Sequence, residues 1–197
     1  MESPFTSMNI EPLTESSDSA LPSGLELHVF LGLSLDGCIA GEQGDLSWME
    51  VCAAESPSDT GYDALMSQVD TLLLGRRTYD AVMAFDDWPF VDKRVHVLTH
   101  RSLVPRFGER ACCGPLREVL TSLAAEGAKR IYIDGGDVVR QALAQDLVNE
   151  MTLSWLPVVL GRGTRLFETG LPGSAWQLAS SRQFSSGMVQ ARYCRRH

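Results

Sequence analysis

The sequence predicts an α/β fold with a mostly parallel, mixed central sheet and an antiparallel hairpin at its C-terminal end. Two observations support this prediction. Three short apolar runs are each followed by glycine or hydroxyl residues, as buried parallel strands commonly are where they lead into loops and helices. The last two strand-like segments are separated only by Ser185-Ser186-Gly187, which favours a tight antiparallel pair.

The first half of the chain alternates strand-like and helix-like segments. The expected elements are a strand over Leu25 to Leu35, the end of a helix over Tyr62 to Ser67, a buried strand over Val69 to Leu74, a helix over Thr78 to Ala84 and a strand over Arg94 to Thr99. The run over residues 69–74 ends in three consecutive leucines, which is typical of a strand covered on both faces.

The alternation continues in the second half. Leu116 to Glu126 carries its apolar residues on one helical face, and Gly127 is well placed to end that helix. Lys129 to Asp134 is strand-like, Asp137 to Gln145 is helical and Val148 to Leu156 is a strand again. The closing strands are expected over 176–184 and 188–194, and they give the parallel sheet a mixed edge.

Length and charge restrict the classes of partner. The chain has 197 residues, 44% hydrophobic and 21% charged, with a formal net charge of -8. This charge argues against a broad nucleic-acid surface or an anionic-membrane surface, because both require a cationic field. No apolar stretch approaches the roughly 18 to 20 residues of a membrane span. We therefore expect neither nucleic acid nor membrane as a partner.

The composition also bears on domains and compartment. Residues 1–24 are acidic, rich in Ser, Thr and Pro and without Lys or Arg, so we expect a flexible N-terminal tail and no secretory signal. Residues 25–197 are expected to form one domain. The five cysteines include no CxxC pair, and their odd number suits free thiols in the cytoplasm. The four histidines lack metal-type spacing, which gives a metal site little support.

Three junctions follow the apolar runs and indicate a ligand site. They are Gly75-Arg76-Arg77-Thr78, Thr99-His100-Arg101 and Gly135-Gly136-Asp137-Val138. Parallel strands deliver their carboxyl ends to a ligand crevice, where glycine allows close backbone approach and helix N-termini favour anions. The arginines supply the local cations that an acidic protein needs to hold an anion. Together the junctions predict a site for a phosphorylated nucleotide.

Five segments, in this order, resemble the dihydrofolate reductase-like superfamily, in particular the branch related to the reductase domain of riboflavin biosynthesis. They are LGLSLDGCIAGEQGDLSW, VDTLLLGRRTYDAV, RVHVLTHR, RIYIDGG and LPVVLGRGTRLF. The resemblance implies a three-layer αβα reductase domain over residues 25–197 that binds NADPH and delivers hydride to a nitrogen heterocycle. It also implies a homodimer, for which Met151 to Leu160 and the terminal hairpin are the candidate surface.

The resemblance assigns cofactor contacts to the junctions. Gly75, Arg76 and Thr78 would bind the pyrophosphate and the adenosine 2'-phosphate, and Thr99 and Arg101 would complete the 2'-phosphate pocket, with preference for NADPH over NADH. The remaining assigned contacts are Gly135, Gly136, Asp137 and Val138 for the pyrophosphate, and Gly32, Ile39 and Ala40 for the nicotinamide. From the residues alone, the arginines are equally explained as a solvated helix start, and the paired glycines as a turn or a close-packing site.

Aromatic residues are the candidates for substrate binding. Trp48 resembles the tryptophan beside the substrate cavity of these reductases, although a core tryptophan also fits. Phe85, Trp88 and Phe90 form either an aromatic wall of the cavity or ordinary packing around Pro89.

Reduction of a C=N bond requires a proton donor near the acceptor nitrogen. In true dihydrofolate reductases an acidic residue follows the tryptophan; here that position is Ala53, with Glu50 and Glu55 nearby but not aligned. The riboflavin branch instead has an acid before its paired glycines, which corresponds to Asp134. That residue is either a catalytic acid or a helix cap. Asp36 is the second candidate catalytic carboxylate, although Asp36-Gly37 is equally explained as a turn.

The resulting hypotheses fall into different classes. The first is an NADPH-dependent reductase of a pterin or aminopyrimidine, with the aminopyrimidine reductase step of riboflavin synthesis as its closest rival. Against that rival, the basic residue that the branch carries in its first strand is Phe30 here, and the zinc deaminase motif is absent from this sequence. The second is a non-catalytic nucleotide-binding sensor or interaction protein. A purely structural domain would leave the order of the junctions unexplained.

Overall fold

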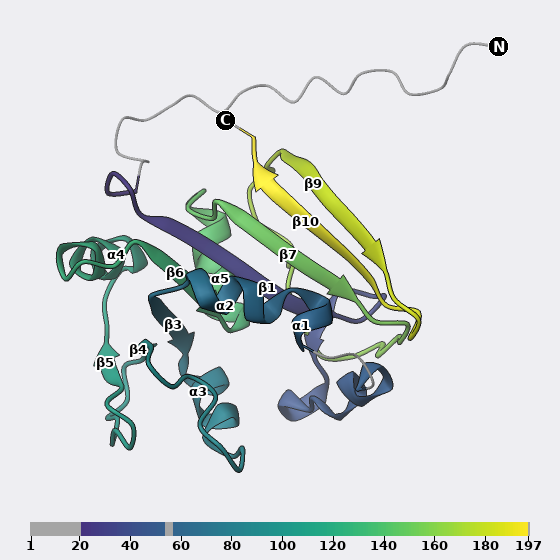
Figure 1. The fold of residues 1–197 in the computed structure, drawn as a ribbon, viewed down its shortest axis with the longest axis horizontal. Helices are drawn as coiled ribbons and strands as arrows, with labels where there is room; N and C mark the ends of the chain where they lie inside the picture. Colours follow the sequence, from purple (N-terminus) through teal and green to yellow (C-terminus); the bar gives the residue numbers. More distant parts are fainter. Residues whose placement is uncertain (1–20, 54–56, 197) are drawn as a thin grey trace.

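The computed structural model describes residues 21–53 and 57–196, and an eight-stranded sheet forms its centre (Figure 1). The strand order is β5-β4-β3-β6-β1-β7-β10-β9. The strands are β1 (Glu26–Leu33), β3 (Thr71–Gly75), β4 (Arg94–Leu98), β5 (Arg110–Cys112), β6 (Arg130–Asp134), β7 (Glu150–Trp155), β9 (Trp176–Gln183) and β10 (Val189–Arg195). The strands from β5 to β7 pair in parallel, while β10 pairs antiparallel with both β7 and β9. The predicted mixed sheet and terminal hairpin are therefore confirmed.

Helices cover both faces of the sheet. On one face, α4 (Leu116–Ala125) and α5 (Gly136–Ala144) bury their apolar residues against leucines, valines and isoleucines of β1, β3, β6 and β7. On the other face, α2 (Tyr62–Gln68) and α3 (Arg76–Val82) pack on β3, β4 and β6. In Figure 1, α2 passes in front of the sheet and α5 lies behind it. The described part of the chain is thus the expected three-layer αβα sandwich.

Short elements surround the carboxyl end of β1. They are β2 (Cys38–Ala40), which pairs antiparallel with β8 (Thr164–Arg165), the 3-10 helices η1 (Glu42–Gly44) and η2 (Ser47–Cys52), and α1 (Pro57–Thr60). Trp48 and Cys52 of η2 are buried in a third apolar cluster with Leu156, Phe184 and Met188. This cluster joins η2 to the segments that follow β7 and β9.

Most segments that the sequence predicts are present with shifted ends. The helix expected over 78–84 is observed two residues earlier, because Gly75 has an extended backbone and α3 begins directly after β3. Gly127 ends α4 as expected: its φ is +88°, and the amide of Ala128 donates to the carbonyl of Leu123 over 2.9 Å.

The predicted N-terminal tail lies largely outside the described residues. Of its residues, Leu21 to Gly24 are described, and Leu21 packs against the larger apolar cluster. Within residues 21–53 and 57–196, none of the helices has the length and apolar character that crossing a bilayer would require.

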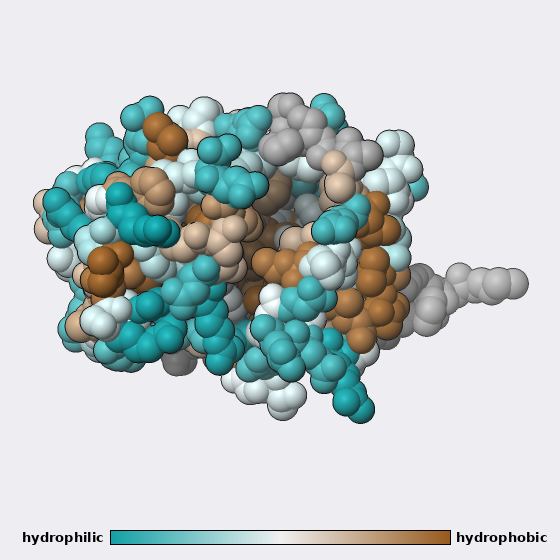
Figure 2. Space-filling view, turned by 90° about the horizontal axis from the view of Figure 1, so that it is seen from below, coloured by the Kyte–Doolittle hydropathy of each residue, from teal (hydrophilic) through white to brown (hydrophobic). Residues whose placement is uncertain are grey.

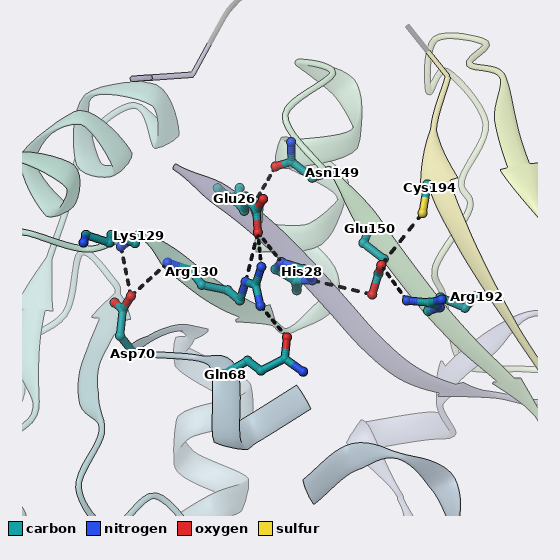
Figure 3. A network of polar contacts seen from close by, with 11 residues as sticks. Glu26, His28, Gln68, Asp70, Lys129, Arg130, Asn149, Glu150, Arg192 and Cys194 are labelled. Carbon is teal, nitrogen blue, oxygen red and sulfur yellow. Dashed lines mark hydrogen bonds and ion pairs between the residues drawn. The ribbon is translucent and has the colours of Figure 1, made fainter. Parts of the chain in front are cut away.

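Asp70 ties three strands together at the amino edge of the sheet, and Figure 3 shows its contacts with Lys129 and Arg130. Its carboxylate accepts hydrogen bonds from the amides of Lys129 and Arg130, at 3.0 and 2.9 Å. It also accepts from the guanidinium of Arg94 at 2.7 Å and from the hydroxyl of Thr71 at 2.6 Å. Burial opposes the charge, but these hydrogen bonds outweigh it and lower the pKa of Asp70.

Asp70→Ala is expected to lower the free energy of unfolding by about 1–3 kcal/mol, because it leaves two strand amides without their acceptor. Since the folded pKa is lowered, the stabilisation by Asp70 is complete above its unfolded value and is lost as the pH falls through the folded value. Urea unfolding at pH 7 and at pH 3 measures both effects. Asp87→Ala, an exposed loop control, is expected to change stability by less than about 0.5 kcal/mol. Equal loss in the two variants would contradict the role of Asp70.

Candidate functional site

The three junctions lie side by side at the carboxyl edge of the sheet. Leu74 of β3 is opposite Asp134 of β6, and Gly75 is opposite Leu98 of β4. Because these strands are parallel neighbours, the residues that follow each of them emerge at the same edge. Seen from below, the molecule has a hollow near the middle of this face, with brown apolar surface inside it and to its right and teal hydrophilic residues below it (Figure 2).

Gly75 and Gly135 pack directly against each other. A Cβ added to Gly135 would lie 2.6 Å from Oγ1 of Thr78 and 3.3 Å from the backbone of Gly75, and the φ of Gly135 is +104°. A Cβ on Gly75 would meet Val138 at 3.4 Å. These contacts explain the glycines by close packing between the two junctions, one of the two readings left open by the sequence. Contact of Gly75, Thr78 and Gly135 with a cofactor stays a prediction.

Gly136 begins α5 beneath two side chains. Its Cβ position is 2.6 Å from Cδ1 of Ile39 and 2.9 Å from Nη1 of Arg140. The amide of Gly135 donates to Asp134 at 2.6 Å and is therefore engaged within the chain. The first-turn amides of a helix have no partner inside it, so those of 136–138 are the donors available for an anion.

Two arginines from different junctions share one carboxylate. Nε of Arg76 lies 2.8 Å from Oδ1 of Asp80, and Nη2 of Arg101 lies 3.2 Å from Oδ2 of the same residue. Arg76 also donates to the carbonyl of Ser102 at 2.9 Å. The buried Thr99 hydroxyl accepts from the amide of Arg101 at 3.0 Å and so holds the turn after β4. Two guanidinium groups against one carboxylate leave one positive charge uncompensated.

The predicted nicotinamide contacts lie at the ends of β1 and β2. Gly32 is covered on the side where a Cβ would project by Met49 and Leu156, at 3.5 and 3.4 Å. Ile39 lies against Gly136, and the carbonyl of Ala40 lies against Gly163. Ile39 and Ala40 thus border the α5 junction through β2, while Gly32 lies beneath η2.

Asp36 anchors the loop that follows β7. Its two carboxylate oxygens accept from the amides of Leu160 and Gly161, at 3.0 and 2.8 Å, and Oδ1 also accepts from the hydroxyl of Ser34 at 2.7 Å. The hydrogen bonds from Leu160 and Ser34 lower the pKa of Asp36 to about 2. A carboxylate that stays ionised at neutral pH is not suited to donate a proton, so this geometry favours a positioning role, and the turn at Asp36-Gly37 is present.

The aromatic candidates separate into two places. Trp48 is buried in the third cluster, and its indole N–H has no hydrogen-bond partner among the described residues. Trp88 belongs to the cluster beneath α3, where it stacks on Phe107 at 4.7 Å and meets the edge of Phe90 at 5.3 Å. Phe85 is 57% exposed. Packing accounts for Trp88 and Phe90, one of the two readings left open by the sequence. Contact of Trp48, Phe85 or Trp88 with a substrate stays a prediction.

Asp134 is the last residue of β6 and directly precedes the third junction. Its Oδ1 accepts from its neighbour's amide, and its Oδ2 lies 3.0 Å from the hydroxyl of Tyr132. Burial, opposed by these two hydrogen bonds, raises the pKa of Asp134 to about 6. Asp134 is therefore a carboxyl that exchanges its proton close to neutral pH, which is the property of a general acid.

Sequence reasoning missed two residues of this site. Asp80 lies four residues after Arg76, a spacing that brings side chains together on a helix, but Arg101 is distant in sequence. Tyr132 lies two residues before Asp134 and so shares its face of β6. Glu50 is exposed on η2, and Glu55 lies outside the described residues.

Comparisons with known proteins agree with this geometry. The model of the RibD C-terminal domain family matches residues 110–190. The uncharacterized protein YwjB of Bacillus subtilis (strain 168) is 31% identical over 178 residues, which are 85% of this chain and 96% of that protein. A solved structure from Shewanella sp. PV-4, provisionally described as a riboflavin biosynthesis protein, is 34% identical with a TM-score of 0.80 and covers 88% of this chain and 100% of its own.

A more distant match shares the fold. Dihydrofolate reductase from Enterococcus faecalis, solved with NADP(H), is 18% identical with a TM-score of 0.64, over 87% of this chain and 97% of its own. The chain belongs to the RibD C-terminal domain family and shares its fold with dihydrofolate reductase.

Proposed function

We propose that this protein is an NADPH-dependent reductase that transfers a hydride to a nitrogen heterocycle of the pterin or aminopyrimidine class. The observation that carries the proposal is Asp134, a half-buried carboxyl with a pKa of about 6 at the edge where the three junctions meet. A carboxyl that titrates near neutrality at a proposed ligand site is suited to protonate a ring nitrogen. Membership of the RibD C-terminal domain family supports the same assignment.

The residues at this edge suit a phosphorylated dinucleotide. The cluster of Arg76, Asp80 and Arg101 keeps one net positive charge for a phosphate, and the first turn of α5 offers amide donors 136–138. When bound, the reduced nicotinamide would supply the hydride. The chain's own part is to hold the phosphates, to orient the heterocycle and to give up the proton of Asp134.

Arg101→Ala is expected to weaken NADPH binding about tenfold or more and to leave NADH binding within about twofold, because only NADPH carries the 2'-phosphate. Titration of cofactor fluorescence measures both constants. Arg110→Ala, which removes another exposed arginine that lies on β5 and pairs with Glu126 at the end of α4, is the matched control and should leave both unchanged. Equal weakening of the two cofactors, or no NADPH binding by the unmodified protein at millimolar cofactor, would overturn this assignment.

The second candidate is the 5-amino-6-(5-phosphoribosylamino)uracil reductase step of riboflavin biosynthesis. The likeness to the Shewanella protein favours it. Against it, Phe30 stands where the branch carries a basic residue, and its ring packs edge-on against Tyr62 at 5.5 Å. An assay with the phosphoribosylated substrate beside dihydrofolate and unphosphorylated aminopyrimidines separates the two. If NADPH binds but no compound in such a panel is reduced, a nucleotide-binding sensor is the better description.

We also propose a homodimer formed through the exposed end of the 151–160 segment and the β9–β10 hairpin, since β7 itself is buried between β1 and β10. Every residue of β9 after Trp176 is exposed, and Leu178 and Val189 are 53% and 45% exposed on this hairpin. A monomeric mass in light scattering would remove this proposal.

A further inference from the structure

The hydroxyl of Tyr132 lies between two acceptors. Its oxygen is 3.1 Å from the backbone carbonyl of Phe30 and 3.0 Å from Oδ2 of Asp134. A phenol has one proton, so it donates to one of these oxygens at a time. The hydroxyl therefore has two orientations, and the protonation state of Asp134 decides between them.

The other oxygen of Asp134 is already engaged. Oδ1 accepts the amide of Gly135 at 2.6 Å, which leaves Oδ2 as the oxygen that carries the acid proton. When Asp134 is ionised, the Tyr132 hydroxyl donates to Oδ2, a charge-assisted hydrogen bond. When Asp134 is protonated, Oδ2 is no longer an anion, and the same hydroxyl donates to the carbonyl of Phe30. Each state thus leaves the buried hydroxyl with an acceptor.

The surroundings leave Tyr132 as the main side-chain partner of this carboxyl. From α2, the ring of Tyr62 meets Phe30 and Tyr132 edge-on, at 5.5 and 6.2 Å. Burial, with the charges of Asp134 and Asp63, raises the pKa of Tyr62 to about 12, and burial raises that of Tyr132 well above its usual value. Both phenols are neutral donors at physiological pH. From β3 and α3, the groups against this junction are Gly75 and Thr78, which are uncharged.

We propose that Tyr132 is a positioning residue that works as a proton-coupled switch: its hydroxyl turns from the Phe30 carbonyl to the Asp134 carboxylate as Asp134 gives its proton to the bound heterocycle. The proposal rests on the reductase function above. The O–H bond of Asp134 breaks, an N–H bond forms on the heterocycle, and the hydride comes from the reduced nicotinamide. One proton is consumed per turnover, and Asp134 regains it from water before the next.

The switch stabilises the anion that proton donation leaves behind. Because a hydrogen bond to a charged group is stronger than one to a neutral group, the Tyr132 hydroxyl favours ionised Asp134 and makes it a stronger acid. Without the hydroxyl, burial would act on the carboxylate with only the Gly135 amide opposing it. Tyr132 thereby sets the pH at which Asp134 can donate.

Tyr132→Phe removes the hydroxyl and keeps the ring that packs beside Tyr62. It is expected to raise the pKa of Asp134 from about 6 to about 7–8, measured by NMR titration of protein with ¹³C-labelled aspartate side chains, assigned with Asp134→Asn. The high-pH limb of kcat should move by the same amount, and kcat at pH 6 should fall about tenfold. NADPH affinity should be unchanged.

Tyr62→Phe is the matched control, because its hydroxyl makes no hydrogen bond with any residue that the structure describes. It should move the Asp134 titration by less than about 0.3 in pH, since only a distant dipole is lost. A second variant with 3-fluorotyrosine at position 132 has a more acidic phenol and a stronger donor. It should lower the Asp134 pKa, a shift opposite in sign to that of Tyr132→Phe.

An Asp134 titration that is unmoved in both position-132 variants overturns the switch. A shift of equal size in Tyr62→Phe also overturns it, because the effect would then belong to the aromatic cluster as a whole. The NMR titration requires no turnover. If it moves as expected while the unmodified protein reduces no heterocycle, the coupling stands and only the proposed reductase function fails.

Discussion

Gly163→Ala is expected to destabilise the protein strongly, whereas Gly161→Ala, two residues earlier in the same loop, is expected to cost little. Both glycines have positive φ, +146° and +73°, so both variants carry backbone strain. The difference lies in the surroundings. A Cβ on Gly163 would be 2.2 Å from the carbonyl oxygen of Ala40 and 3.1 Å from Cα of Gly41, but one on Gly161 meets no described atom within 4 Å.

The clash falls on backbone, which cannot turn aside as a flexible side chain can. Relief requires that β8 moves away from β2, which breaks the pairing of Ala40 with Thr164. We expect a loss of about 3 kcal/mol or more for Gly163→Ala and about 1 kcal/mol for Gly161→Ala. Urea unfolding of both variants measures the difference.

The same pair of variants tests the link between this loop and the cofactor edge. Because Ile39 of β2 lies against Gly136, displacement of β2 should disturb the start of α5 and weaken NADPH binding. Gly161→Ala should bind NADPH normally, since its amide still reaches Asp36. If the two alanine variants are equally stable, the backbone of Gly163 does not lie against the carbonyl of Ala40 as described.

The sheet could be predicted because its strands have strong local signals. Val69 to Leu74 is mostly apolar and is followed by Gly75, and the terminal strands flank a short polar turn; the strand and the hairpin are both present. The elements that were missed are very short. β2, β5 and β8 have three, three and two residues, too few to show a periodicity, and tertiary pairing alone defines them.

The sequence predicted where the backbone of the candidate site lies better than it predicted what each side chain does. The three junctions share one edge because β4, β3 and β6 are neighbours, and the carboxyl ends of parallel strands always lie at the same edge of a sheet. The function of single side chains depends on neighbours that are far away in sequence. Asp36 is an example: the largest cause of its low pKa is the amide of Leu160, 124 residues later, followed by the nearby Ser34 hydroxyl, with a smaller contribution from Gly161, 125 residues later. No local pattern could distinguish it from Asp134.

Asp134→Asn is expected to lower kcat at least about 100-fold while NADPH affinity is retained, because asparagine keeps the shape and the acceptor for Gly135 but has no acidic proton. Under the proposed mechanism the unmodified protein reacts only with Asp134 protonated, so kcat should fall about tenfold per pH unit above about pH 6. Stopped-flow or steady-state NADPH oxidation across pH 5–9 (roughly the range over which such a group titrates) measures this limb. Asp36→Asn is the matched carboxylate control, and in this variant kcat should begin to fall at the same pH as in the unmodified protein.

Stability gives an independent measure of the same carboxyl. Folding raises the pKa of Asp134 from 3.8 to about 6. The free energy of unfolding is therefore not reduced by Asp134 below pH 3.8, and it falls as the pH rises from 3.8 through about 6. Asp134→Asn removes this cost and should unfold less readily than the unmodified protein at pH 8, by about 2–3 kcal/mol, but not at pH 4. A variant that loses activity and gains stability at pH 8 would identify Asp134 as a group kept for chemistry at the expense of the fold. Loss of both would instead make it a structural cap of α5.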